Sequence, residues 1–75
     1  MHTTYAAAYA AHYPRYTALW STRSIGACLG AREDIYATLR AQGDERTPYT
    51  GKLYAELDAI RDRELDLANR RNRRS

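Results

Sequence analysis

The segment from Pro48 to Asn69 constrains the fold most, because it is patterned as one uninterrupted helix in a chain of only 75 residues. Thr47 and Pro48 form a typical helix start, with threonine as the N-cap and proline at the first helical position. Apolar residues then recur at helical spacing, namely Leu53, Leu57, Ile60 and Leu67. We expect this long helix to be the scaffold on which shorter helices pack.

The composition of the chain favours an all-α fold. The sequence contains no Val and no Phe, whereas Ala, Leu, Arg and Glu are common. The first two residue types build strands, and the other four are good helix formers. We therefore predict one domain over residues 1–75, a small bundle of three to four helices, in which residues 69–75 form a frayed basic tail.

Pro14 is predicted to divide the N-terminal region. Thr3 or Thr4 caps a first helix that ends near Tyr13, because Pro14 lacks the amide hydrogen that a helix interior requires. Pro14 is also well suited to open a second helical segment. The sequence thus predicts an interruption between residues 13 and 14.

Glycines are predicted to set the ends of the next helices. Ser21 or Thr22 caps a short segment that ends at Gly30, since glycine is a common helix terminator. A further helix over residues 31–42 carries acidic residues in its first turn and is followed by Gly43. Both features are typical of a helix with well-defined ends.

Charge alternates along the chain, although the formal net charge is only +3. Residues 1–32 contain three Arg and no acid, and residues 33–66 contain nine acids against five bases. The last nine residues carry four arginines, namely Arg70, Arg71, Arg73 and Arg74. A basic tail of this kind can neutralise phosphates without sequence preference, or it can simply be a solvated helix end.

Residues 22–41 resemble a helix-turn-helix, with Gly30 as the turn. In this arrangement Tyr36 would be buried, Ile35 would face solvent, and Arg32 would lead into DNA. Two carboxylates follow Arg32 directly, and they would repel a polyanion. The alternative is a simple packed helical hairpin.

Aromatic residues recur every three or four positions near the N-terminus, namely at Tyr5, Tyr9, Tyr13, Tyr16 and Trp20. They form one stripe if the helix continues through Pro14. The stripe is either a face that packs on the long helix or a partner-binding surface with Arg15 and Arg23 beside it, because Tyr, Trp and Arg are enriched at interface centres. Of these aromatic residues, we expect Tyr5 and Tyr9 to be the harder to bury.

Nothing in the sequence predicts catalysis, a metal or a cofactor. His2, His12 and Cys28 match no zinc-ligand spacing, and no third group is placed to orient a Cys–His pair. Asp58, Asp62 and Asp66 line one helix face, which a solvated surface explains better than a cation site. A single cysteine excludes an internal disulfide and favours a reducing, cytoplasmic location. No segment is long and apolar enough to span a membrane.

We therefore expect a non-enzymatic helical protein that binds a protein partner stoichiometrically, as a regulator or inhibitor within a nucleic-acid-handling assembly. Direct binding of DNA or RNA through Arg32, the basic tail and the aromatic stripe is the first alternative. The second alternative is a homo-oligomer through the apolar seam of the long helix.

Overall fold

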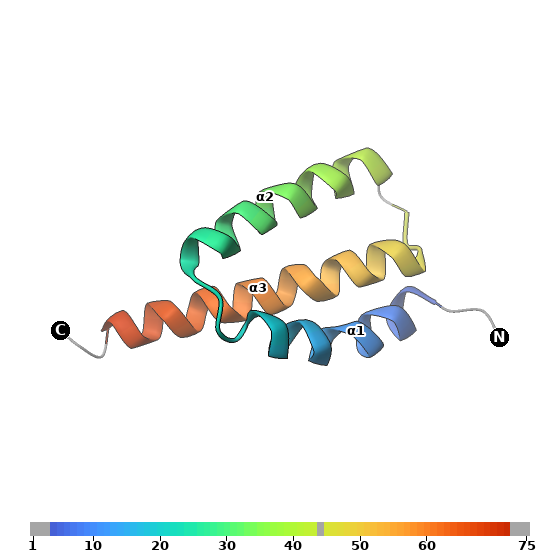
Figure 1. Ribbon diagram of the computed structural model, residues 1–75. Coiled ribbons are helices and arrows are strands. Elements are labelled where there is room, and N and C mark those ends of the chain that lie inside the picture. The colour runs from blue at the N-terminus through green and yellow to red at the C-terminus, as the bar shows by residue number, and fades with distance from the viewer. Residues whose placement is uncertain (1–3, 44, 73–75) are drawn as a thin grey trace.

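The computed structural model describes residues 4–43 and 45–72, and these fold into three helices (Figure 1). Helix α1 covers Tyr5–Trp20, α2 covers Ile25–Gln42 and α3 covers Pro48–Asn72. The described part contains no strand. The prediction of an all-α fold is therefore confirmed, with a long C-terminal helix as expected.

Helix α1 begins where the sequence predicts but does not stop at Pro14. Thr4 is the N-cap, and its Oγ1 accepts a hydrogen bond of 3.1 Å from the Ala7 amide. The predicted end near Tyr13 is wrong, because the helix continues through Pro14 to Trp20. An interior proline costs about 3 kcal/mol. Packing of α1 against α3 on both sides of Pro14 offsets this cost.

Helix α2 is longer than predicted, because the two segments expected on either side of Gly30 form one helix. The cap is Ser24 and not Ser21 or Thr22, and Ser24 Oγ accepts a 3.2 Å hydrogen bond from the Ala27 amide. Gly30 lies inside the helix without a positive φ angle. The turn that a helix-turn-helix over residues 22–41 requires is therefore not formed.

Gly43 ends α2 as predicted. Its φ angle is +72°, in the left-handed region that side chains avoid, and its N–H donates to the Arg40 carbonyl. Thr47 and Pro48 then start α3, and the side chains of Thr47 and Thr50 each accept from the other's amide. Helix α3 runs to Asn72, beyond the expected end at residue 69.

Helix α3 lies between α1 and α2, parallel to the first and antiparallel to the second (Figure 1). It contacts both, whereas α1 and α2 scarcely touch each other. The Cα atoms span 49 × 24 × 15 Å. The width of 24 Å fits three helices side by side at spacings of about 8–10 Å. The predicted bundle is thus an open layer centred on α3.

Small residues let α1 and α3 approach closely. Gly51, Ala55 and Ala59 recur every four residues on α3, and all are buried. The two helices are close at Gly51, where an added Cβ would lie 2.4 Å from the Tyr5 carbonyl oxygen. A side chain at this position would therefore collide with the backbone of α1.

Two tyrosines of α1 are hydrogen bonded to two aspartates of α3. Tyr9 donates to Asp58 and Tyr13 donates to Asp62, and both pairs are 49 residues apart. The equal offset is what a parallel helix pair produces, because both helices advance by one turn together. The interpretation as a solvated face fits Asp62, which is exposed, whereas Asp58 is half-buried; both carboxylates also help to set the register of α1.

These hydrogen bonds predict a loss of stability at alkaline pH. Burial raises the pKa of Tyr9, with the hydrogen bond to Asp58 as the second cause, and the hydrogen bond to Asp62 raises the pKa of Tyr13. Tyrosines of the unfolded chain release protons near pH 10, before those of the folded protein. The stabilisation is thus complete below about pH 10 and is lost as the pH rises further.

Urea unfolding between pH 9 and pH 12 measures this loss. Tyr9→Phe removes one of the titrating hydroxyls, so we expect a shallower decline together with a lower stability at neutral pH, by about 1–2 kcal/mol. Tyr49→Phe is the control, because Tyr49 is 49% exposed. Equal declines for Tyr9→Phe and the parent protein would contradict the proposed contribution of the Tyr9 hydroxyl.

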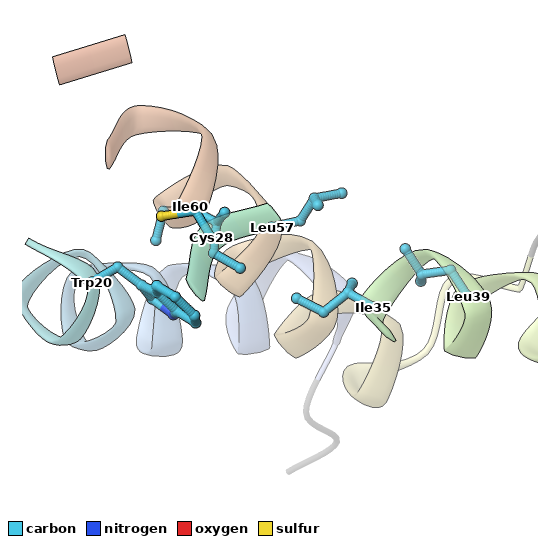
Figure 2. Close-up of a cluster of buried hydrophobic side chains, with 7 residues drawn as sticks. Trp20, Cys28, Ile35, Leu39, Leu57 and Ile60 are labelled. Carbon is cyan, nitrogen blue, oxygen red and sulfur yellow. The ribbon is translucent and has the colours of Figure 1, made fainter. Parts of the chain in front are cut away.

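The hydrophobic core lies mainly between α2 and α3, with Trp20 closing one end (Figure 2). Its members are Trp20, Cys28, Ile35, Leu39, Leu57, Ala59 and Ile60. Ile35 is inside and Tyr36 outside, the reverse of the helix-turn-helix assignment. Leu57 and Ile60 are buried within the chain and Leu53 packs against them. Three residues of the seam predicted to pair two copies thus pack within one chain, whereas Leu67 is not part of this core.

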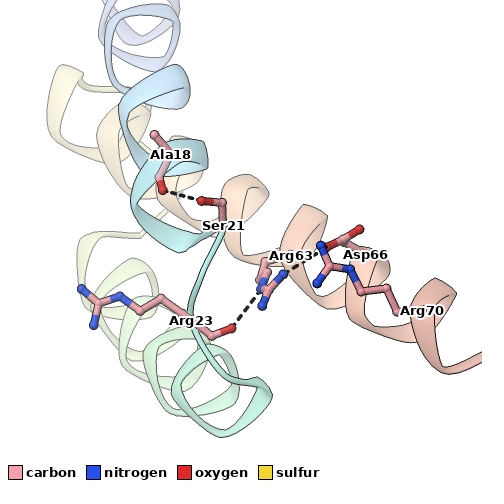
Figure 3. A network of polar contacts seen from close by, with 6 residues as sticks. All are labelled: Ala18, Ser21, Arg23, Arg63, Asp66 and Arg70. Carbon is pink, nitrogen blue, oxygen red and sulfur yellow. Dashed lines mark hydrogen bonds and ion pairs between the residues drawn. The ribbon is translucent and has the colours of Figure 1, made fainter.

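Arg63 ties the α1–α2 connection to α3 (Figure 3). Its Nε donates to the Arg23 carbonyl at 2.9 Å, and its Nη1 lies 3.0 Å from Asp66 Oδ2. Arg70 Nη2 pairs with the same carboxylate oxygen at 3.3 Å. Asp66 therefore forms ion pairs with two arginines.

Candidate interaction surface

The aromatic stripe of α1 packs mainly on α3. Tyr5, Tyr9, Tyr13 and Tyr16 are half-buried, and Trp20 is 9% exposed. Tyr5 meets Tyr54 of α3 edge to face, with ring centroids 5.9 Å apart. The stripe is therefore chiefly an intramolecular contact, and of the predicted partner-binding residues Arg15 and Arg23 remain exposed.

Of the predicted nucleic-acid contacts, the structure describes the side chains of Arg32 and Arg70. Arg32 pairs with Glu64 at 3.0 Å, and Arg70 pairs with Asp66. The Arg71 side chain, together with Arg73 and Arg74, lies outside the described residues. The described arginines that were expected to meet phosphates thus already have carboxylate partners.

A different stripe, on α2, exposes large apolar side chains. Ile25, Leu29 and Tyr36 are 49%, 43% and 48% exposed. Their spacing of four and seven residues places them on one helix face. This face is adjacent to the buried one, since each of Leu29 and Tyr36 directly follows a core residue, Cys28 or Ile35.

Charged side chains flank these apolar residues. Arg32 and Glu33 occupy the middle of the stripe and Arg40 lies toward its C-terminal end. Glu33 makes no ion pair with any other described residue. We define the α2 stripe as Ile25, Leu29, Arg32, Glu33, Tyr36 and Arg40, which share about one third of the helix circumference.

Two adjoining open hollows extend the stripe toward the α2–α3 connection. The first has a volume of about 360 Å³ and is lined by Tyr36, Leu39, Arg40, Gly43 and Tyr54. The second, of about 400 Å³, shares Gly43 and Tyr54 and adds Tyr5, Glu45 and Arg46. The Arg46 guanidinium carbon lies 5.7 Å from the Tyr5 ring centroid. Three tyrosines and two arginines thus line one concave region.

The sequence contained a signal for the α2 stripe that the assumed turn at Gly30 obscured. With residues 25–42 taken as one helix, Ile25, Leu29 and Tyr36 fall on one face and Cys28, Ile35 and Leu39 on another. An apolar surface on two adjacent faces exceeds what one neighbouring helix can cover. Sequence periodicity alone does not say which face stays exposed.

Cys28 is buried in the core between α2 and α3. Burial raises the pKa of the Cys28 thiol and so disfavours the thiolate. Across residues 4–43 and 45–72, no three His, Cys, Asp or Glu side chains are grouped to hold a metal ion. The same residues include no helix long and apolar enough to cross a membrane. Comparisons with protein-family models, curated proteins and solved structures found no match to this chain.

Proposed function

We propose that this protein is a non-enzymatic helical binding protein that acts stoichiometrically on a protein partner, through the α2 stripe and the adjoining tyrosine–arginine hollows. The observation that carries the proposal is the exposure of Ile25, Leu29 and Tyr36 on one face of α2. Exposed apolar residues on one helix face, with charged side chains beside them, are typical of protein–protein contact sites.

The residue types of this surface support the same role. Tyrosine and arginine combine a large contact area with hydrogen-bonding capacity, and both are enriched where binding energy concentrates. The two hollows share Gly43 and Tyr54 and adjoin the stripe, so one protein segment could contact all of them. A regulator or inhibitor within a nucleic-acid-handling assembly remains the class of role that we propose.

Direct nucleic-acid binding is less well supported, for two structural reasons. Residues 25–42 form one helix, so no recognition helix follows a turn at Gly30. Arg32 also pairs with Glu64, and this ion pair lowers its net attraction for phosphate. The basic tail is a separate element, and deleting residues 70–75 would reduce the salt dependence of any binding through it.

Affinity capture from the source cell, with and without nuclease, tests the proposed function. We expect the chain to capture a partner protein whose recovery does not change on nuclease treatment. The variant Leu29→Lys should recover at least ten-fold less of this partner. Leu19→Lys is the matched control, because Leu19 is 47% exposed but lies on α1. Loss of the captured protein on nuclease treatment, or equal losses of capture for the two variants, would contradict the proposal.

A further inference from the structure

We infer that the α2 stripe binds the same stripe of a second copy of this chain, with the two α2 helices antiparallel. This inference rests on the proposed function, because it names a partner for the same surface. The α2 stripe is a different surface from the seam predicted on α3. Leu57 and Ile60 of that seam are already buried within one chain.

The stripe is complementary to itself when it is reversed. An antiparallel pair with its two-fold axis between residues 32 and 33 places Leu29 opposite Tyr36 of the second copy. The same register places Arg32 opposite Glu33 of the second copy, and Ile25 beside the aliphatic stem of its Arg40. Each contact occurs twice, as a closed two-fold interface requires.

Charge complementarity favours this orientation. Arg32 donates through Nη1 to Glu64, and a guanidinium has further N–H groups that can bind a second carboxylate. Its side chain is 39% exposed, and Glu33 is exposed beside it. The N–H groups of Arg32 that Glu64 leaves free can bind Glu33 across the axis, with an attraction that Glu64 weakens as it does that for phosphate. A parallel pairing in register would place Arg32 against Arg32 and Glu33 against Glu33.

Sedimentation equilibrium of the full chain tests the inference. We expect a mass of twice 8.6 kDa at about 100 μM. Glu33→Arg would place like charges opposite each other at both central pairs, so we expect at least a ten-fold weaker dimer. Asp34→Arg is the matched control, because it makes the same charge change at an exposed neighbour outside the stripe. Circular dichroism verifies that both variants are helical.

A mixing experiment tests the antiparallel register. Leu29→Lys and Tyr36→Glu alter two exposed positions, and each variant alone should be monomeric at a concentration where the parent chain is dimeric. Their equimolar mixture should form a heterodimer, because Lys at 29 then faces Glu at 36. A mixture that stays monomeric would overturn the register.

Other outcomes separate this inference from the proposed function. A parent chain of 8.6 kDa at every concentration, or equal weakening by Glu33→Arg and Asp34→Arg, would overturn the dimer. If capture of another protein still depended on Leu29, the proposed function would stand without the dimer. A dimer in a chain that captures no other protein would support the inference and contradict the proposed regulatory role.

Discussion

Gly51→Ala is expected to destabilise the protein by about 2 kcal/mol, although alanine is the better helix former. The new Cβ would lie 2.4 Å from the Tyr5 carbonyl oxygen, and this atom belongs to a backbone that cannot rotate away. The clash forces α1 and α3 apart and strains the neighbouring Tyr9–Asp58 hydrogen bond. The midpoint of thermal unfolding should fall by roughly 10 °C.

Gly30→Ala is the matched control for this prediction, because it makes the same change inside another helix. An added Cβ at Gly30 would meet nothing within 4 Å. We therefore expect this variant to stabilise the protein by about 0.5–1 kcal/mol, through helix propensity alone. If both variants changed the unfolding midpoint in the same direction, close packing of α1 at Gly51 would not be supported.

Leu57→Ala is expected to cost about 3 kcal/mol, because it leaves a cavity in the core between α2 and α3. Leu57 is 7% exposed, and the core of this chain is small. A single core in a domain of this size supplies only about 3–5 kcal/mol. A substantial fraction of the variant should therefore be unfolded at 25 °C.

Urea unfolding followed by Trp20 fluorescence measures this effect, at one fixed protein concentration because association changes apparent stability. Leu65→Ala is the control, since Leu65 is 56% exposed on the same helix. We expect the control to change the free energy of unfolding by less than about 0.5 kcal/mol. A loss for Leu65→Ala as large as that for Leu57→Ala would contradict the assignment of the α3 face that packs against α2.

Local sequence signals predicted the all-α class and several helix ends. The residues at these helix ends act through their own side chains or backbone angles, so a few neighbouring residues are enough to predict each end. They are Thr4, Gly43, Thr47 and Pro48. Pro14 and Gly30 were mispredicted for the complementary reason. Their intrinsic cost to a helix is local, whereas the packing on α3 that offsets it comes from residues distant in sequence.

The α2 stripe was not predicted from the sequence, because its exposure depends on which faces the helices cover. The tyrosine stripe has interface chemistry, but Asp58 and Asp62 lie at the spacing that pairs them with Tyr9 and Tyr13. Only the parallel arrangement of α1 and α3 brings these four residues together. The exposure of Tyr36 likewise depends on tertiary packing. Ile35 faces α3 and is buried, and the next residue, Tyr36, is therefore left exposed.

Site-specific photo-crosslinking in cells tests the central claim, that α2 is the binding surface, most directly. A photoreactive amino acid in place of Tyr36 should form a discrete crosslink to a protein, and a product of twice 8.6 kDa identifies the second copy. The same amino acid at Ala10, an exposed position of α1, should form none. Crosslinks to nucleic acid at position 36, or to the same protein at position 10 alone, would contradict the account.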